Sequence, residues 1–393
     1  MNLRVRRRFT VNLEKEKLHM AATQTPAGAK TRAEIHSQPA CWNDCFTALD
    51  KSKEVDRICN DLSKEAEPLF IGCGSSYYIS LAAAASWQSI TGARARAVPA
   101  SELLLFPDYA LNDTVEYQPI LVSRSGHSSE VVRAARYLED ERKIPTLAIS
   151  CSKDHPLGET SRAMIHLLPA DEESVVMTRS FSSMLLALQF LAACFVHQEK
   201  ITEGLRRLPE ALRPILDGLS ARVEEFVQSG HFADYVFLGQ GPLFGIASEG
   251  QLKLLEMSCS YAQVFHTLEF RHGPRAVVGP ETLITFLLSE SAYAAECEVL
   301  EEMKALGATT LVIANQADAA AGASADFLVE LNLEVPECVR LVGYLLTCQL
   351  LGLYTGLKKG YDIDNPRHLS RAVILDSAAP ATVVQDDPVE GAA

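Results

Sequence analysis

A pattern of strand, glycine-containing turn and helix that occurs twice is the strongest constraint on how this chain can fold. The segment FIGCG at 70–74 is matched by FLGQG at 237–241, and LAIS at 147–150 is matched by LVIA at 311–314. The offset between the copies stays between 164 and 167 residues, which chance similarity does not explain. Strands that alternate with loops and helices form a parallel sheet with helices on both faces. The sequence therefore predicts an α/β protein built from two tandem copies of one unit.

The repeat divides the chain into four parts. Residues 1–33 are expected to form a flexible N-terminal arm, in which Met20 is a second candidate start. Residues 34–200 would form the first domain, beginning with helices over 34–66, and residues 201–378 the second domain. The acidic, Ala- and Pro-rich residues 379–393 are expected to be a disordered tail.

Composition narrows the class of protein. A length of 393 residues favours two domains, and 48% hydrophobic with 22% charged residues is ordinary for a soluble globular protein. A net charge of −14 argues against a nucleic-acid partner. Ten scattered cysteines without a CxxC pair fit a reducing cytoplasm. The basic start is not followed by an apolar run, and no segment is apolar enough to span a bilayer, so we expect a cytoplasmic protein without a membrane partner.

Two serine-rich loops in the first copy are candidate anion sites. The strand ending at Gly72 leads into Ser75 and Ser76, and the strand 119–122 leads into SRSGHS at 123–128. Ligands of parallel sheets bind beyond the carboxyl ends of the strands, where backbone N–H groups, hydroxyls and helix N-termini attract a phosphate. The candidate substrate-binding residues of the second loop are Ser123, Arg124, Ser125 and Ser128. Serines at such positions also serve as plain helix caps, an alternative that the sequence leaves open.

No cofactor is expected at these loops. The sequence contains neither the GxxxxGK[ST] motif of nucleoside triphosphate sites nor the GxGxxG motif of dinucleotide sites. The histidines show no paired ligand spacing, so no metal is expected either. A phosphorylated metabolite is the natural ligand.

The second copy lacks the serine loops and carries acid–base residues instead. Glu249, Lys253 and Glu256 stand at i, i+4 and i+7 of a predicted helix, which places them on one stripe. The alternative is a solvated stripe joined by one ion pair. Sixteen residues beyond Glu256 comes His272, within RHGP at 271–274. A carboxylate base with a histidine acid is a usual combination for moving protons on a sugar. One half is thus predicted to hold the phosphate and the other to do the proton chemistry.

These motifs resemble the sugar isomerase (SIS) family over roughly residues 50–375, in a double-SIS arrangement with flavodoxin-like domains. CGSSY at 73–77 and SRSGHS at 123–128 resemble the phosphate loops of the isomerase domain of glucosamine-6-phosphate synthase. SEGQLKLLE at 248–256 resembles its LEGxLKxxE helix, and HGP at 272–274 its HGP element. DNPRHL at 364–369 resembles its C-terminal loop.

The resemblance implies roles for individual residues. The serines at 75, 76, 123, 125 and 128 would hold the sugar phosphate. Glu256 would shuttle the proton between C1 and C2, with Lys253 beside it and Glu249 at the substrate. His272 would open the sugar ring and reach into the site of a partner subunit, which implies a homodimer with shared active sites.

Departures from the synthase pattern point to a related reaction. The chain has no glutamine amidotransferase domain before the repeat, and no counterpart of the C-terminal lysine used in ring opening. EES at 172–174 and MTRSF at 177–181 resemble the tagatose-6-phosphate ketose/aldose isomerase group, which is better viewed as amino-sugar phosphate deaminases. The resemblance therefore implies an amino-sugar 6-phosphate deaminase/isomerase that converts galactosamine or glucosamine 6-phosphate to ketose 6-phosphate and ammonia. The alternatives are an aldose–ketose phosphate isomerase, a fructosamine-6-phosphate deglycase and a non-catalytic sugar-phosphate sensor.

Overall fold

Two parallel five-stranded sheets form the framework of the protein. The structure, a computed structural model, describes residues 26–375. The strands of the first sheet are β1 (Glu67–Gly72), β2 (Arg96–Pro99), β3 (Tyr117–Val122), β4 (Leu147–Ser150) and β5 (Ala163–His166). Those of the second are β6 (Asp234–Gly239), β7 (Ala262–Phe265), β8 (Thr282–Leu287), β9 (Thr309–Ala314) and β10 (Phe327–Glu330). The orders are β2-β1-β3-β4-β5 and β10-β9-β8-β6-β7, so the second sheet repeats the topology of the first and the predicted fold class is confirmed.

The central strands are apolar throughout because helices cover both of their faces. Leu69, Phe70 and Ile71 of β1 are fully buried, as are Leu283 and Ile284 of β8. The edge strands β2 and β7 were not predicted. Each has four residues of mixed burial, and such short segments carry no continuous apolar signal.

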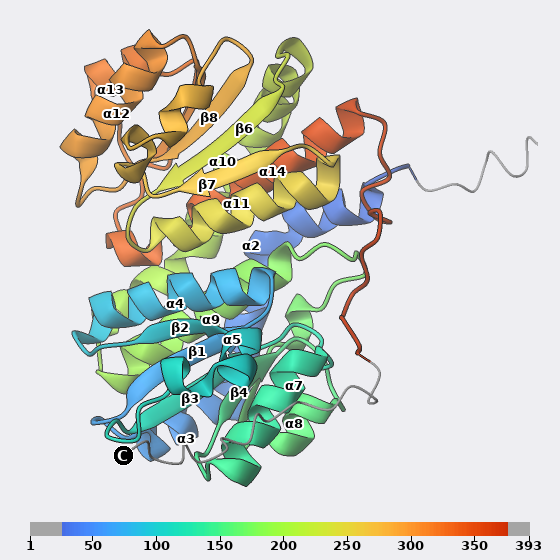
Figure 1. The fold of residues 1–393 in the computed structure, drawn as a ribbon, viewed down its shortest axis with the longest axis vertical. Helices are drawn as coiled ribbons and strands as arrows, with labels where there is room; N and C mark the ends of the chain where they lie inside the picture. Colours follow the sequence, from blue (N-terminus) through green and yellow to red (C-terminus); the bar gives the residue numbers. More distant parts are fainter. Residues whose placement is uncertain (1–25, 376–393) are drawn as a thin grey trace, which may run out of the picture.

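Helices in the layer between the sheets bring the two halves together. Figure 1 shows the sheets as two stacked lobes, with α4 (Ser75–Thr91) on the lower lobe facing α11 (Leu243–Ser258) on the upper one. The two helices approach so closely at Gly245 that a Cβ there would lie 2.7 Å from the backbone nitrogen of Ala82. This contact sets the middle of α4 against the start of α11, and the start of α4 meets the middle of α11, where Ser75 contacts Glu249 and Lys253.

Long helices enclose this layer, and short ones cover the outer faces of the sheets. The long helices are α2 (Ala29–Ser52), α9 (Arg179–Phe195), α10 (Glu199–Ser229) and α14 (Leu341–Lys358). The outer helices are α5 (Ala100–Leu105), α6 (Pro107–Ala110), α7 (Ser129–Arg136), α8 (Pro156–Thr160), α12 (Tyr293–Ala305) and α13 (Ala319–Ser324). The short helix α3 (Glu54–Asp61) packs instead against α9 and the edge strand β5. Within residues 26–375, no helix has both the length and the apolar character needed to cross a membrane.

Both chain ends of the described region are held by contacts with parts of the chain far away in the sequence. Helix α2 begins at Ala29, so the expectation of an arm over residues 1–33 is wrong for its last five residues. The carboxylate of Asp364 accepts hydrogen bonds from the backbone N–H groups of Lys30 (3.0 Å) and Thr31 (2.9 Å), which caps this helix. The C-terminal segment then runs down beside the lower lobe, where the carbonyl of Val373 accepts from the N–H of Ser129 (3.0 Å) (Figure 1). Residues 1–25 of the expected arm and the tail expected over 379–393 lie outside the described residues.

Candidate active site

The first serine loop meets the acid–base stripe of α11. The Lys253 Nζ donates to the Ser75 Oγ (3.2 Å), lies 3.2 Å from the Glu249 Oε1 and pairs with the Glu256 carboxylate. The Ser75 hydroxyl in turn donates to the Glu249 Oε1 (3.1 Å). The side chains of Glu249 and Lys253 are fully buried, whereas that of Glu256 is 19% exposed. Glu249 and Lys253 are therefore not part of a solvated stripe. Ser75 from the first half of the repeat and three residues from the second form one polar cluster.

Burial and charge tune this cluster. Burial raises the pKa of Glu249 to about 8, although the Lys253 ammonium opposes that shift. Burial also disfavours the charged form of Lys253, but the carboxylates of Glu249 and Glu256 outweigh it, and the pKa of Lys253 lies above its ordinary value. The cluster thus pairs one ammonium with two acids, of which Glu249 is the harder to ionise. Of the two acids, Glu256 is the one whose side chain reaches solvent.

The turn that carries Ser75 and Ser76 is shaped by glycine. A Cβ at Gly72 would lie 2.5 Å from the backbone of Ser76, and Gly74 has φ +56°. Ser75 and Ser76 are both 6% exposed and lie at the start of α4. Because its hydroxyl bonds to Lys253 and Glu249, Ser75 links the loop to the acid–base residues in addition to its expected role at the phosphate.

The second serine loop follows β3, the neighbour of β1, at the same edge of the sheet. The Ser123 Oγ accepts from the N–H of Gly126, and the Ser125 Oγ from the N–H of His127, both at 3.1 Å. Ser128 directly precedes α7. Gly126 has φ +68°, and a Cβ there would overlap the imidazole of His155. The imidazole of His155, a residue that the sequence analysis did not single out, thus packs directly against the loop at Gly126.

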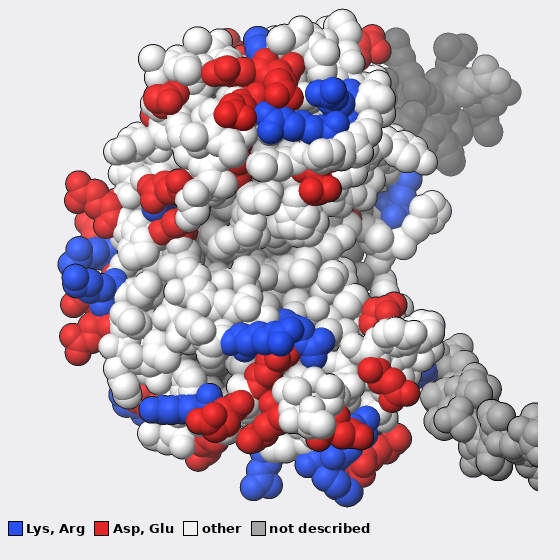
Figure 2. Space-filling model, turned by 60° about the vertical axis from the view of Figure 1, so that its left-hand side comes forward, with Lys and Arg blue, Asp and Glu red and all other residues white. Residues whose placement is uncertain are grey.

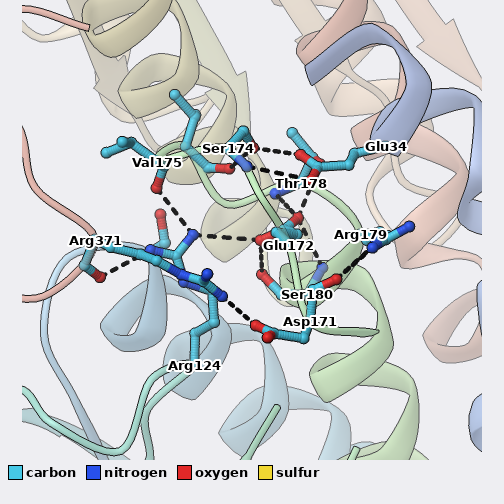
Figure 3. A network of polar contacts seen from close by, with 12 residues as sticks. Glu34, Arg124, Asp171, Glu172, Ser174, Val175, Thr178, Arg179, Ser180 and Arg371 are labelled. Atoms are coloured by element: carbon cyan, nitrogen blue, oxygen red, sulfur yellow. Dashed lines mark hydrogen bonds and ion pairs between the residues drawn. The ribbon is translucent and has the colours of Figure 1, made fainter. Parts of the chain in front are cut away.

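Arg124 differs from its expected role at the substrate. Its side chain is 4% exposed and is directed into the protein, toward the buried carboxylate of Glu172 (3.4 Å). It also donates to the backbone carbonyls of Val175 (2.9 Å) and Arg371 (2.8 Å), as Figure 3 shows. Arg124 therefore joins the second serine loop to the loop before α9 and to the C-terminal segment. Its side chain thus makes structural contacts here, and the expected contact with the substrate stays a prediction.

Two acids, Glu34 of α2 and Glu172 within EES at 172–174, also belong to this network. Glu172 accepts from the backbone N–H groups of Thr178 (2.7 Å) and Ser180 (3.1 Å) and from both of their hydroxyls. Glu34, from α2, accepts from the N–H groups of Glu173 (2.6 Å) and Ser174 (3.2 Å) (Figure 3). These acids shape the loop before α9 and do not form a separate reactive group.

His272 lies on an exposed loop of the single chain. The loop is held through its neighbour Arg271, whose guanidinium bonds to the carboxylate of Glu302 (2.8 and 3.0 Å). Within residues 26–375, the His272 side chain makes no hydrogen bond. Its ring-opening role and its place in a partner's site stay predictions.

The distribution of charged and metal-ligating side chains bears on binding of nucleic acid and of metal ions. On the face shown in Figure 2, basic and acidic side chains are mixed on both lobes, and no continuous basic band is present. Over residues 26–375, no group of three or more His, Cys, Asp or Glu side chains is arranged to hold a metal ion. All ten cysteines are free.

Comparison with known proteins agrees with this architecture. A family model described as the SIS domain matches residues 61–194 and 234–351. The chain is 25% identical over 351 residues to the isomerizing glutamine–fructose-6-phosphate aminotransferase of Methanothermobacter thermautotrophicus, covering 87% of this chain and 57% of the relative. The corresponding protein of Gloeobacter violaceus is 28% identical over 363 residues, covering 87% and 58%. The chain thus spans somewhat more than half the length of these curated relatives.

Solved structures of similar length match nearly end to end. The glucosamine-6-phosphate deaminase of Thermotoga maritima has a TM-score of 0.71 and 28% identity, covering 88% of this chain and 100% of that one. The tagatose-6-phosphate ketose/aldose isomerase of Escherichia coli has a TM-score of 0.76 and 24% identity, covering 90% and 97%. Since the family model matches both copies of the repeat, the chain belongs to the SIS family of phosphosugar isomerase domains and carries two of them.

Proposed function

We propose that this protein is an amino-sugar 6-phosphate deaminase/isomerase that converts a hexosamine 6-phosphate to a ketose 6-phosphate and ammonia. The observation that carries the proposal is the contact between Ser75 of the first half and the Glu249, Lys253 and Glu256 stripe of the second. Burying a lysine and a glutamate is costly, and such perturbed groups cluster at functional sites. This cost disfavours a sensor that binds the sugar without chemistry.

The proposed reaction uses one base, Glu256, which first removes a proton from the sugar and later returns it. In the open-chain sugar, Glu256 takes the proton from C2 and the electron pair forms the C1–C2 double bond. The C1 carbonyl oxygen becomes a hydroxyl by taking a proton from the ammonium group at C2 of the sugar. The Lys253 ammonium stabilises the negative charge that develops during this step. Protonated Glu256 then returns the proton to C1, which leaves a ketimine at C2. Water adds to the ketimine, ammonia departs and the ketose 6-phosphate remains.

The phosphate would lie at the carboxyl edge of the first sheet. There, the serine loops after β1 and β3 offer hydroxyls and helix N-termini to an anion. His272 would open the ring from the partner subunit of a homodimer. We place the enzyme in the cytoplasm, where its ten free thiols would stay reduced.

Two similar structures favour different members of this reaction class. The Thermotoga maritima neighbour, named as a glucosamine-6-phosphate deaminase, supports release of ammonia. The Escherichia coli neighbour is named as a ketose/aldose isomerase, which keeps an isomerisation without ammonia as the second candidate. The same stripe serves both reactions, because both move a proton between C1 and C2.

The deciding experiment measures ammonia and ketose together. Purified protein is incubated with glucosamine, galactosamine or fructosamine 6-phosphate, with unsubstituted hexose 6-phosphates as controls. Equal amounts of ammonia and ketose 6-phosphate from an aldosamine phosphate are expected. Interconversion of unsubstituted sugars alone would favour the simple isomerase, and release from fructosamine 6-phosphate alone the deglycase. Binding of sugar phosphates without any turnover would refute the enzyme proposal.

Shared active sites can be tested by complementation. Inactive Glu256→Gln and His272→Ala chains are mixed, dissociated and reassociated. If His272 acts in the partner's site, mixed dimers contain one intact site and activity returns. A monomer by analytical ultracentrifugation, or no recovery in mixed dimers, contradicts the shared site.

A further inference from the structure

The second copy contains a loop that matches the phosphate loop of the first. The loop after β8 stands in the second sheet where the loop after β3 stands in the first, because both strands lie at the centre of the same strand order. Its sequence, SES at 289–291, precedes α12 as SRSGHS at 123–128 precedes α7. It therefore offers the same kinds of donors, backbone N–H groups and hydroxyls, at the edge of the sheet.

Those donors are already bonded to carboxylates of the chain itself. The Glu296 Oε2 accepts from the N–H (2.6 Å) and the hydroxyl (3.0 Å) of Ser289. The Glu337 Oε1 accepts from the N–H of Glu290 (2.6 Å), and its Oε2 from the hydroxyl of Ser291 (2.6 Å). Two amides and two hydroxyls thus converge on acidic oxygens, as they would on the oxygens of a phosphate.

The surrounding residues stabilise this arrangement. Glu296 comes from α12 and is fully buried, and Glu337 comes from the turn Glu337–Val339 before α14. The buried guanidinium of Arg340 binds both carboxylate oxygens of Glu290 at 2.5 Å. This contact neutralises the Glu290 side chain, which would otherwise add a third negative charge to the loop.

The first copy differs at this point. Among residues 26–375, no carboxylate accepts a hydrogen bond from the backbone or the hydroxyls of the 123–128 loop. Ser123 and Ser125 instead accept from N–H groups of their own loop. The amides and hydroxyls of the first loop are therefore not bonded to a carboxyl group, whereas those of the second loop are bonded to two.

We propose that the carboxyl groups of Glu296 and Glu337 fill the phosphate position of the second copy, so that each chain binds one phosphosugar, in the first copy. A phosphate ester approaching the second loop would meet two acids, and the N–H groups of Ser289 and Glu290 and the hydroxyls of the two serines are already bonded to them. This inference rests on the proposed function for its first-copy site. It also gives a physical reason why a duplicated fold would have one binding half and one acid–base half.

The test counts phosphate sites on the full chain. Isothermal titration with inorganic phosphate and with glucitol 6-phosphate, which has no carbonyl to react, is expected to give one site per wild-type chain. Glu337→Ala frees the Glu290 N–H and the Ser291 hydroxyl, so the number of phosphate sites should rise to two. Glu334→Ala, at an exposed acid of the same segment, is the matched control and should keep one site.

Each outcome decides the proposal. Two sites in the wild type, or one site in a folded Glu337→Ala chain, would overturn it. Should Glu337→Ala not fold, Glu337→Gln removes the charge and keeps one oxygen acceptor, and the same gain of a site is expected. If the wild type binds nothing while Glu337→Ala gains one site, the first-copy assignment fails and the inference about the second copy stands.

Discussion

Removing the guanidinium of Arg124 tests whether the second serine loop is held from inside the protein. In Arg124→Met, the loop loses an ion pair to Glu172 and two hydrogen bonds to the carbonyls of Val175 and Arg371. In Glu172→Gln, the buried guanidinium loses its carboxylate. The NH2 group of the new side-chain amide would also lie against the N–H and O–H groups of Thr178 and Ser180, which donate to carboxylate oxygens in the wild type.

The structure predicts different costs for the two substitutions. Breaking a buried ion pair by removing one partner costs about 3–5 kcal/mol of unfolding free energy. Glu172 keeps four donors in Arg124→Met, so we expect a loss near 3 kcal/mol for that variant. Glu172→Gln leaves Arg124 without a counterion, at 4% exposure, and should lie near 5 kcal/mol.

Urea denaturation followed by circular dichroism measures both values. The control is Arg136→Met, at an exposed position of α7, which should change the unfolding free energy by no more than about 0.5 kcal/mol. Affinity for inorganic phosphate should also fall in Arg124→Met, because the loop is less fixed. A loss below about 1 kcal/mol in Arg124→Met, or a milder effect of Glu172→Gln, would refute the reasoning.

Three further predictions follow from buried groups. Gly126→Ala forces a Cβ into the ring of His155 at φ +68° and should weaken phosphate binding at least tenfold by titration, whereas unchanged affinity would show that the loop adapts. Lys253→Met leaves Glu256 and Glu249 without their cation and should cost about 3 kcal/mol in urea denaturation and abolish turnover; an active variant would exclude the lysine from the mechanism. Burial raises the pKa of Glu296 from 4.5 to about 7, so the stability that its protonation provides is present below pH 4.5 and is lost as the pH rises through about 7. Unfolding free energy should therefore fall by up to about 3 kcal/mol over that range, and Glu296→Gln should remove this dependence; an unchanged slope would assign it to other groups.

Much of the fold was predictable because its main signals are local. Strands buried on both faces are apolar runs, and the repeat at a nearly constant offset showed that the same topology occurs twice. The four-residue edge strands β2 and β7 escaped prediction because their half-exposed residues resemble loops. The start of α2 was placed too late since its cap, Asp364, lies at the other end of the sequence.

The candidate site was predictable in its residue types and less so in its contacts. The i, i+4, i+7 spacing identified Glu249, Lys253 and Glu256, but only the packing of α4 on α11 shows Ser75 bonded to them. Arg124 lies between two serines, a position that suggests a ligand contact, yet its side chain is directed inward. Such directions depend on partners far away in the sequence, which spacing cannot reveal.

The central claim is that the helix of the second half moves a proton on a sugar held by the first half. Nuclear magnetic resonance of a hexosamine 6-phosphate in D2O follows this step directly, because a proton removed from C2 and returned to C1 is exchanged with solvent deuterium. The wild type should place deuterium at C1 of the ketose product. Glu256→Gln should lower the rate by about 10²–10⁴-fold while still binding the sugar phosphate. Deuterium incorporation by Glu256→Gln at the wild-type rate would contradict the account.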